Sequence, residues 1–181
     1  MRKNRNILLF GNPILRQVAK PVMIYHKKLH SLIDSISFTL DNSKDSAAIA
    51  ANQMGILKRI IVINYEGEYL EMLNPEIISS DGDQIDYEGC LSFPEYVGLV
   101  PRAENISVKF NDRFGREFII QKSGKLARCI QHEIDHLNGI LYIDRMEEKY
   151  LIQKDTDLQI SLIEVIDLAN GTKEMKTIRN S

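Results

Sequence analysis

Two histidines and a glutamate lie close together in the segment His132-Glu133-Ile134-Asp135-His136. In an α-helix, residues four apart are separated by about one turn, roughly 6 Å along one face, so the two imidazoles can bind one metal ion. Glu133 lies about 100° around the helix from His132, where it can contact a water molecule without binding the metal. Two of four histidines at this spacing could also arise by chance. The pattern nevertheless favours a divalent-metal site with Glu133 as the general acid/base.

A catalytic metal site of this kind needs a third protein ligand, because three ligands and one open position are the usual arrangement. In the longer pattern HExxHxxGxxH a third histidine follows the glycine, but this chain has Tyr142 at that position. A more distant glutamate such as Glu164 stays open as the third ligand, although no flanking pattern supports it. The two cysteines, Cys90 and Cys129, are candidates as well, since thiolate binds zinc and ferrous iron strongly.

Cys129 lies on the same helical stripe as the two histidines, three residues before His132. It is about 10.5 Å of helical rise from His136, and its Cβ directs the sulfur toward the helix N-terminus, away from the ion. We therefore interpret Cys129 as a packed neighbour of the site. Cys90 belongs to the segment Glu88-Gly89-Cys90-Leu91-Ser92, whose glycine lets the backbone approach a ligand closely. On these residues alone, the third ligand stays open.

The histidines need a helix to hold them, and the sequence predicts one from Ser123 onward. Its apolar face consists of Leu126, Ile130, Ile134 and Leu137. Ser123 suits the N-cap position, and Gly139 suits the position after the helix end. A second amphipathic helix is expected over residues 25–42. Its apolar residues, at spacings of four, three and four, are Leu29, Ile33, Ile36 and Leu40.

Short runs of β-branched and aromatic residues predict strands around these helices. The expected strands are Arg59–Asn64, Tyr69–Leu73, Ile106–Phe110 and Glu117–Gln121. Asn74-Pro75 should end the second strand, and residues 111–115 should join the last two as a hairpin turn. The apolar residues after Tyr150 fit neither a helical nor a strand period. Strands without regular βαβ alternation predict an α+β fold with antiparallel sheets.

Composition limits the classes of function. The chain has 181 residues, 44% of them hydrophobic, and we expect a single domain over residues 1–181. The net charge of −2 provides no strong field, which argues against direct binding to nucleic acid or to an anionic membrane. The apolar run Ile7–Phe10 is too short for a signal peptide or a membrane span. We therefore expect a cytoplasmic protein, in which a cysteine packs, reacts or binds metal more often than it forms a disulfide.

Three segments, in order, resemble the signature motifs of the peptide deformylase family. They are Ala50-Ala51-Asn52-Gln53, EGCLS over residues 88–92 and QHEIDHLNG over residues 131–139. The resemblance covers nearly the whole chain, from Gly11–Arg16 to Ile143-Asp144-Arg145. Three ordered motifs are far more specific than HExxH alone. The resemblance implies the α+β deformylase fold, with antiparallel β-sheets packed around a central metal-binding helix.

The resemblance also implies an activity and the residues that perform it. The enzyme would hydrolyse the N-formyl group of the N-terminal formyl-methionine of newly made proteins and release formate. The implied metal ligands are Cys90, His132 and His136. Glu133 would be the acid/base, with Gln53 and the backbone N–H of Leu91 stabilising the oxyanion. The implied substrate cleft includes Ala48, Glu88, Gly89, Arg102, Arg128 and Cys129. Taken alone, Glu88 and Arg102 would be interpreted as surface charges, and Gln53 as a polar residue of a turn.

For the cofactor, the resemblance implies one divalent metal, with Fe²⁺ expected and Zn²⁺, Ni²⁺ or Co²⁺ as replacements. The partners would be N-formylmethionyl nascent polypeptides, with action near the ribosome left open. One departure concerns the first motif, where the family usually has G-x-G before Ala-Ala and this chain has Ser46 and Ala48. We expect an intact metal centre, a reshaped cleft and a lower kcat/KM. Two alternatives are a zinc endopeptidase of the HExxH type and a catalytically weak deformylase-like paralogue.

Overall fold

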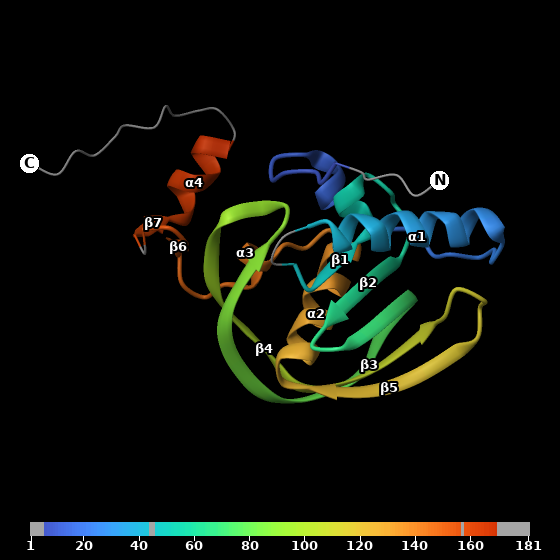
Figure 1. The fold of residues 1–181 in the computed structure, drawn as a ribbon. Helices are drawn as coiled ribbons and strands as arrows, with labels where there is room; N and C mark the ends of the chain where they lie inside the picture. Colours follow the sequence, from blue (N-terminus) through green and yellow to red (C-terminus); the bar gives the residue numbers. More distant parts are fainter. Residues whose placement is uncertain (1–5, 44–45, 157, 170–181) are drawn as a thin grey trace, which may run out of the picture.

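The computed structural model describes residues 6–43, 46–156 and 158–169 (Figure 1). Its elements in chain order are η1 (Pro13–Arg16), α1 (Lys27–Asp41), β1 (Ala48–Ala50), η2 (Ala51–Met54), β2 (Ile60–Tyr65), β3 (Glu68–Cys90), β4 (Phe93–Asn111), β5 (Glu117–Ser123), α2 (Gly124–Leu137), α3 (Tyr142–Arg145), β6 (Tyr150–Gln153), β7 (Gln159–Ser161) and α4 (Leu162–Ala169). Residues 170–181, the end of the tail, lie outside the described residues.

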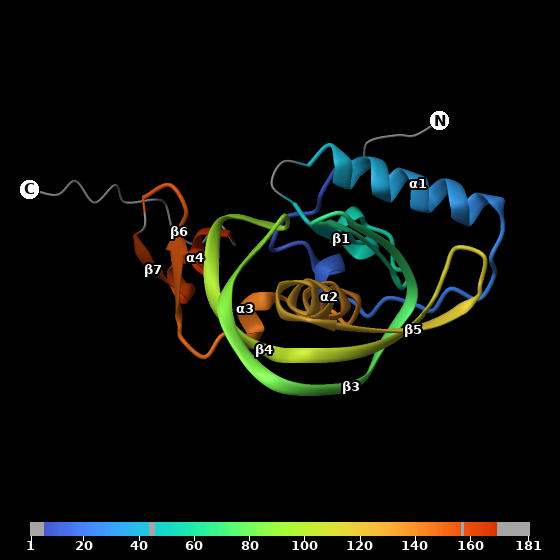
Figure 2. The same ribbon diagram turned by 60° about the horizontal axis from the view of Figure 1, so that its bottom comes forward.

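A single antiparallel sheet contains the strands of the described part of the chain. Its order is β1-β2-β3-β4-β6-β7, with β5 paired to β4. β3 and β4 are long and strongly curved, and Figure 2 shows them wrapping around α2, which is seen nearly along its axis. The prediction of an α+β fold with antiparallel pairing around a central helix is confirmed, with one bent sheet in place of several.

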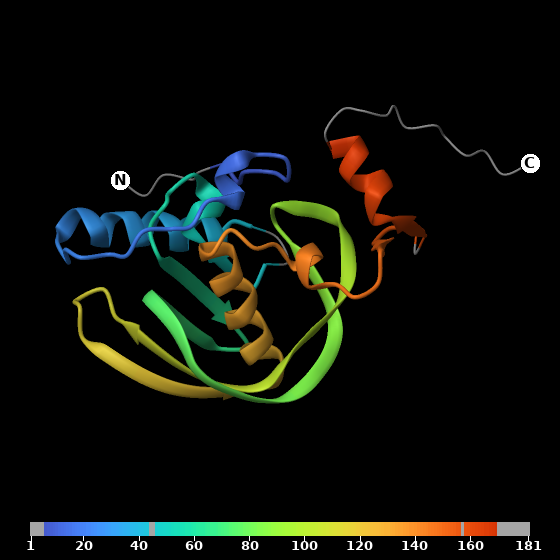
Figure 3. The ribbon, with the colours of Figure 1, turned by 180° about the vertical axis from the view of Figure 1, so that it is seen from behind.

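The helix α2 is enclosed on most of its surface. Its apolar residues Ile130, Ile134 and Leu137 are buried against β1, β2 and β4, as the sequence predicts, whereas Leu126 is only partly buried. Ser123 occupies the N-cap position without a side-chain hydrogen bond. Every residue from Ile130 to Leu137 is buried, including the polar ones, and Figure 3 shows α2 running inside the curved sheet. A helix so enclosed holds its polar side chains in fixed positions.

The predicted helix over residues 25–42 is α1, which lies across β1 and β2 (Figure 1). Its four predicted apolar residues are buried in a second core cluster that includes Ile60, Val62 and Leu73. This cluster lies on the face of β2 opposite α2, because alternate residues of a strand face opposite sides. The sheet at β1 and β2 is therefore covered by a helix on each face.

The predicted end of the second strand at Asn74-Pro75 is wrong. β3 continues through these residues with a shift in register between Leu73 and Glu76. Asn74 adopts a positive φ of 53° and binds the N-terminal segment, accepting from Val22 N (2.7 Å) and donating to Val22 O (2.9 Å). The two turn-forming residues thus make a bulge inside a long strand, which bends it, in place of a strand end.

The other predicted strands are confirmed. β2 corresponds to Arg59–Asn64 within one residue, and β4 and β5 form the predicted hairpin. Asp112 Oδ1 closes its turn by accepting from the backbone N–H groups of Phe114 and Arg116, both at 2.9 Å. The tail after Tyr150 contains both kinds of element, β6 and β7 followed by α4. Among the described residues, no helix is long and apolar enough to span a bilayer.

Candidate metal centre and substrate cleft

The ligands implied by the sequence converge at the end of β3. The candidate ligand atoms of Cys90, His132 and His136 all lie within 4.8 Å of one another. Cys90 Sγ is 3.2 Å from His136 Nε2, and the two imidazole centroids are 4.9 Å apart. α2 supplies both histidines from one face, and the last residue of β3 supplies the thiol. The helical spacing and the strand end therefore build one site.

Glu88 fixes the imidazole ring of His132 through a hydrogen bond. Glu88 Oε2 accepts from His132 Nδ1 at 2.8 Å, which leaves Nε2 of the same ring available to a metal. Glu88 also accepts from Arg102 (2.8 and 2.9 Å) and from Arg128 Nη1 (2.8 Å). Burial alone would raise the pKa of Glu88, but the hydrogen bonds from Arg102 and His132 hold that pKa at about 2. Glu88 is therefore a buried carboxylate, and the interpretation of Glu88 and Arg102 as surface charges is wrong.

The charged network extends beyond Glu88. Arg102 Nη1 donates to Asp135 Oδ2 at 2.5 Å, and Arg145 donates to both oxygens of Asp135 at 2.7 and 3.0 Å. Asp135 lies on α2 between the two histidines, and Arg145 ends α3. The network thus links α2 to β4 and α3. Asp135 and Arg145 are residues that sequence reasoning missed, since neither spacing nor composition indicates that Asp135 becomes buried or that the exposed Arg145 pairs with it.

Glu133 lies beside the three ligands without belonging to their cluster. Its side chain is buried, and in the described part of the chain its Oε2 has no hydrogen-bond partner. Burial raises the pKa of Glu133 above its usual value, an effect that His132 and His136 oppose. A buried carboxyl with a raised pKa and an unpaired oxygen is suited to accept and return a proton.

Gln53 projects from η2 toward the ligands. Its Nε2 donates to Cys90 Sγ (3.4 Å) and to Ser92 Oγ (3.2 Å), while its Oε1 accepts from Ala50 N (2.9 Å). The turn interpretation of Gln53 is therefore incomplete: it closes a turn and also faces the site. Leu91 follows Cys90 and lines the same cleft. Ser92, which fixes the Gln53 amide, had no signal in the sequence beyond its place in the EGCLS segment.

The donor set fits one divalent cation. A thiolate and two imidazoles are ligands that zinc and ferrous iron accept. Burial alone would raise the pKa of the Cys90 thiol, but the facing imidazoles of His136 and His132 hold it well below its usual value. His136 Nδ1 and Asn52 Oδ1 are buried without partners among the described residues, although Asn52 Nδ2 donates to His136 O at 2.5 Å. The thiolate form that a metal requires is thus favoured by the protein itself.

The other candidate ligands lie outside this cluster. Cys129, on α2, is partly buried and packs against the hydrophobic core, and burial raises the pKa of its thiol well above the usual value. The interpretation of Cys129 as a packed neighbour is therefore confirmed. Tyr142, at the position of the missing third histidine, stacks its ring 6.1 Å from that of His132. Glu164 is exposed on α4 and is not part of the cluster found among the described residues.

A cleft of about 510 Å³ opens in front of the ligands. Among the residues that the sequence assigns to it, the lining includes Ala48, Glu88, Gly89, Arg128 and Cys129. Arg102 is not in this lining, because it lies behind Glu88. Lys154, just past β6, also lines the cleft, with Nζ 3.3 Å from the position of a Cβ added to Gly89. Nothing in the sequence placed Lys154 there, since the antiparallel pairing of β6 with β4 brings it in.

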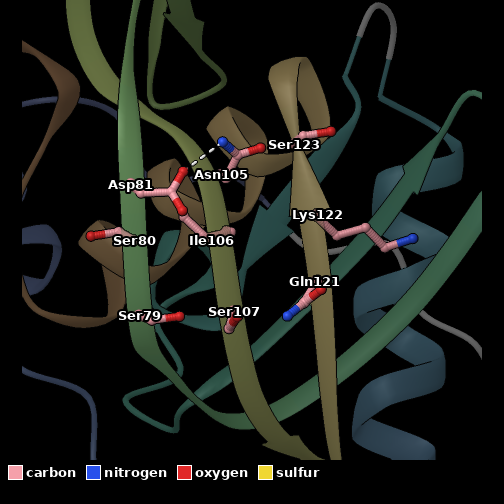
Figure 4. A pocket seen from close by; sticks show the side chains of 9 residues that line it. All are labelled: Ser79, Ser80, Asp81, Asn105, Ile106, Ser107, Gln121, Lys122 and Ser123. Atoms are coloured by element: carbon pink, nitrogen blue, oxygen red, sulfur yellow. Dashed lines mark hydrogen bonds between the residues drawn. The ribbon is translucent and has the colours of Figure 1, made fainter.

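A second hollow lies over β3, β4 and β5, and Figure 4 shows its lining. It has a volume of about 410 Å³ and is lined mainly by hydroxyl and amide side chains, with Asn105 Nδ2 donating to Asp81 Oδ1 at 2.6 Å. None of the residues that the sequence assigns to chemistry lines it. The metal-centred cleft is therefore the candidate functional site.

Comparison with known proteins agrees with this geometry. Residues 4–151 match the family model described as polypeptide deformylase. A peptide deformylase of Heliobacterium modesticaldum is 45% identical over 141 residues, which cover 78% of this chain and 93% of the relative. The peptide deformylase of Thermotoga maritima, known from a crystal structure, is 37% identical in sequence to this chain, with a TM-score of 0.78. The match covers 81% of this chain and 99% of the Thermotoga chain. A Met-Ala-Ser-bound class I type b peptide deformylase from Acinetobacter baumannii is 33% identical, with a TM-score of 0.76, over 81% of this chain and 100% of that one. With the three ordered motifs, the converged ligands and these matches in agreement, the chain belongs to the peptide deformylase family.

Proposed function

We propose that this protein removes the N-formyl group from the formyl-methionine of newly made polypeptides through the residues described above. The observation that carries this proposal is the convergence of Cys90, His132 and His136 within 4.8 Å, with Glu133 beside them at the floor of an open cleft. A hydrolase of this kind needs a metal, an acid/base and an oxyanion site within reach of one carbonyl group. This cleft offers candidates for all three.

We propose that Cys90, His132 and His136 hold one divalent metal, with Fe²⁺ expected and Zn²⁺, Ni²⁺ or Co²⁺ as replacements. When bound, such a cation supplies a Lewis acid that polarises the carbonyl group and lowers the pKa of water. Glu88 orients His132 for this task, since a hydrogen bond to the second ring nitrogen fixes the tautomer of a ligating histidine.

Glu133 handles the protons. Its carboxylate accepts a proton from the attacking water, and the resulting nucleophile forms a bond to the formyl carbon. Glu133 then delivers that proton to the nitrogen of the methionine as the carbon–nitrogen bond breaks, which releases formate and a free amino terminus. The carboxyl is suited to both steps because its burial raises its pKa above the usual value.

Gln53 and Leu91 stabilise the negative charge that develops on the formyl oxygen. Gln53 Nε2 already points toward Cys90, and its orientation is fixed by Ser92 Oγ and by the Ala50 N–H at its other end. A donor held in place before the reaction stabilises the transition state without a cost of reorganisation. The backbone N–H of Leu91, adjacent to Cys90, would be the second donor.

The peptide would lie in the cleft beside β1. In the described part of the chain β1 is an edge strand, with β2 on one side only, so an extended peptide can add to it through backbone hydrogen bonds. By the family resemblance, the methionine side chain would enter the part of the cleft flanked by Arg128 and Lys125. The relative from Acinetobacter that is bound to Met-Ala-Ser carries the reaction product of such a substrate, which supports a peptide in this cleft.

The partners follow from the reaction. Formylated amino termini belong to chains that are still being made or have just been completed, and we propose that the protein acts on them in the cytoplasm, near the ribosome. The net charge of −2 favours binding through the nascent peptide over binding through nucleic acid.

The deciding experiment compares formyl-Met-Ala with Met-Ala-Ser, using protein loaded anaerobically with Fe²⁺. We expect formate release from the first and no cleavage of the second. Cleavage of the unformylated peptide at an internal bond would instead indicate the endopeptidase alternative, which no feature of the described cleft supports. Formate release that stays near the uncatalysed rate in metal-loaded, folded protein would contradict the proposal and favour the weak paralogue.

A further inference from the structure

Ser46 makes a hydrogen bond that a glycine at this position could not make. Its Oγ donates to the backbone carbonyl of Ala48 at 3.0 Å. Both residues line the substrate cleft, and both stand where the family's first motif usually has glycine. The Ser46 hydroxyl therefore occupies a backbone acceptor at the edge of the proposed peptide site.

The direction of the Ala48 carbonyl follows from the pairing of β1 with β2. Asn64 N donates to Ala47 O at 2.8 Å, so the carbonyl of Ala47 points toward β2. Neighbouring residues of a strand direct their carbonyls to opposite sides. The carbonyl of Ala48 therefore points away from β2, toward the side of β1 where the described chain has no further strand. This is the side that an added peptide strand would use.

The side chain of Ala48, unlike its carbonyl group, faces the hydrophobic core. Its methyl group is buried in the core cluster that includes Ile61, Ile63 and Ile130. Ala48 does not have a positive φ, so the backbone at this residue does not require glycine. The substitution that changes the peptide side of β1 is therefore Ser46, through its hydroxyl.

We propose that Ser46 determines how tightly the enzyme binds its peptide, by competing with a substrate backbone N–H for the carbonyl of Ala48. This inference rests on the proposed function, since it needs a formyl-peptide beside β1. A carbonyl oxygen has two lone pairs, so the hydroxyl weakens the peptide's hydrogen bond without blocking it. The Ser46 hydroxyl stops competing for this carbonyl only when the serine side chain rotates away from the Ala48 oxygen.

The test uses Ser46→Ala, which removes the hydroxyl and keeps the backbone preference nearly unchanged. With formyl-Met-Ala-Ser as substrate, we expect KM to fall ~5-fold at unchanged kcat, a change equivalent to ~1 kcal/mol of binding. The inhibition constant of the product Met-Ala-Ser should fall by a similar factor. Ser46→Thr keeps a hydroxyl and should retain the KM of the unmodified protein. Ser43→Ala is the matched control, because Ser43 Oγ also donates to a backbone carbonyl, that of Thr39 at 2.8 Å, away from the cleft.

A second arm identifies the competing group on the substrate. Formyl-Met-Ala-Ser is N-methylated at one amide at a time, which removes one N–H donor from each analogue. The gain from Ser46→Ala should vanish for one analogue and persist for the others. An unchanged KM in Ser46→Ala, or a gain that survives every methylation, would overturn the inference while formate release by the unmodified protein still supports the proposed function. Absence of formate release in all variants would instead count against the proposed function itself.

Discussion

Glu88 Oε2 and His132 Nδ1 lie 2.8 Å apart, which ties a buried carboxylate of β3 to a proposed metal ligand of α2. The carboxylate is itself fixed by Arg102 and Arg128. Because Nδ1 is occupied by this bond, the ring can present only Nε2 to a cation. The orientation of His132 therefore depends on a residue outside the cluster of candidate ligands.

Replacing Glu88 by Gln should weaken metal binding by about 10- to 100-fold, as is usual when the partner of a ligating histidine is changed. The amide keeps the shape of the side chain but loses the charge that orients His132 and neutralises two arginines. The measurement is the rate of zinc loss to a chelator from folded protein, checked by circular dichroism. Glu95→Gln is the control, because Glu95 is an exposed acid of the same cleft. Equal rates for Glu88→Gln and the unmodified protein would contradict the assigned role.

Replacing Glu133 by Ala should leave the metal bound and reduce kcat by ~10²–10⁴-fold, the usual effect of losing a positioned acid/base. In the proposed mechanism the carboxylate transfers protons, and it lies outside the cluster of candidate ligands, so its removal should not release the ion. Metal content and formate release are measured on the same sample. If the variant lost its metal but kept normal activity per bound ion, Glu133 would be a ligand and not the acid/base.

The two cysteines should respond differently to replacement by Ala. Cys90→Ala should lose the metal and the activity together, because Cys90 Sγ belongs to the ligand cluster. Cys129→Ala should retain a full equivalent of metal, because the Cys129 thiol packs against the core and burial keeps its pKa high. Metal analysis after dialysis checks both variants. Loss of metal from Cys129→Ala at normal secondary structure would show that the ligand set is wrong.

The fold was partly predictable because local patterns report local structure. The helices α1 and α2 follow from apolar spacing, and Gly139 marks the end of α2 correctly. The length of β3 could not be foreseen, since Asn74-Pro75 is a bulge only because Asn74 binds the distant Val22 backbone. The pairing of β6 with β4 depends on tertiary contacts in the same way. A single domain over residues 1–181 stays a prediction.

The candidate metal ligands were more predictable than the charged residues that surround them. The ligand spacing on α2 is a property of any helix, and the EGCLS motif supplied Cys90. The burial of Arg102 and Asp135 could not be deduced, because a charged residue is exposed unless a partner is buried with it. The pairing of the exposed Arg145 with Asp135 had no signal in the sequence either. The competing hydroxyl of Ser46 likewise appears only once the direction of the Ala48 carbonyl is known.

The last prediction concerns Gly139, which ends the metal helix. Gly139 has a φ of 73°, and its N–H donates to His136 O at 3.0 Å. A Cβ at this position would lie 2.5 Å from the carbonyl oxygen of Arg16 and 2.7 Å from its carbonyl carbon. Gly139→Ala therefore combines an unfavourable φ with a collision between two backbones. The φ alone costs about 1–2 kcal/mol, and forced movement of packed backbone typically adds ~1–3 kcal/mol.

Gly67→Ala separates the two effects, because Gly67 has a φ of 85° but nothing within 4 Å of an added Cβ. Urea unfolding of zinc-loaded protein should show a loss of about 1–2 kcal/mol for Gly67→Ala, from the backbone conformation alone. Gly139→Ala should lose more than Gly67→Ala, because η1 must move away from the end of α2. That movement also disturbs the carbonyl of His136, so Gly139→Ala should release zinc to a chelator faster, whereas Gly67→Ala should not. Equal losses of stability in the two variants would mean that the Arg16 backbone moves away from residue 139 at no cost in free energy. The end of α2 would then not be held in place by η1.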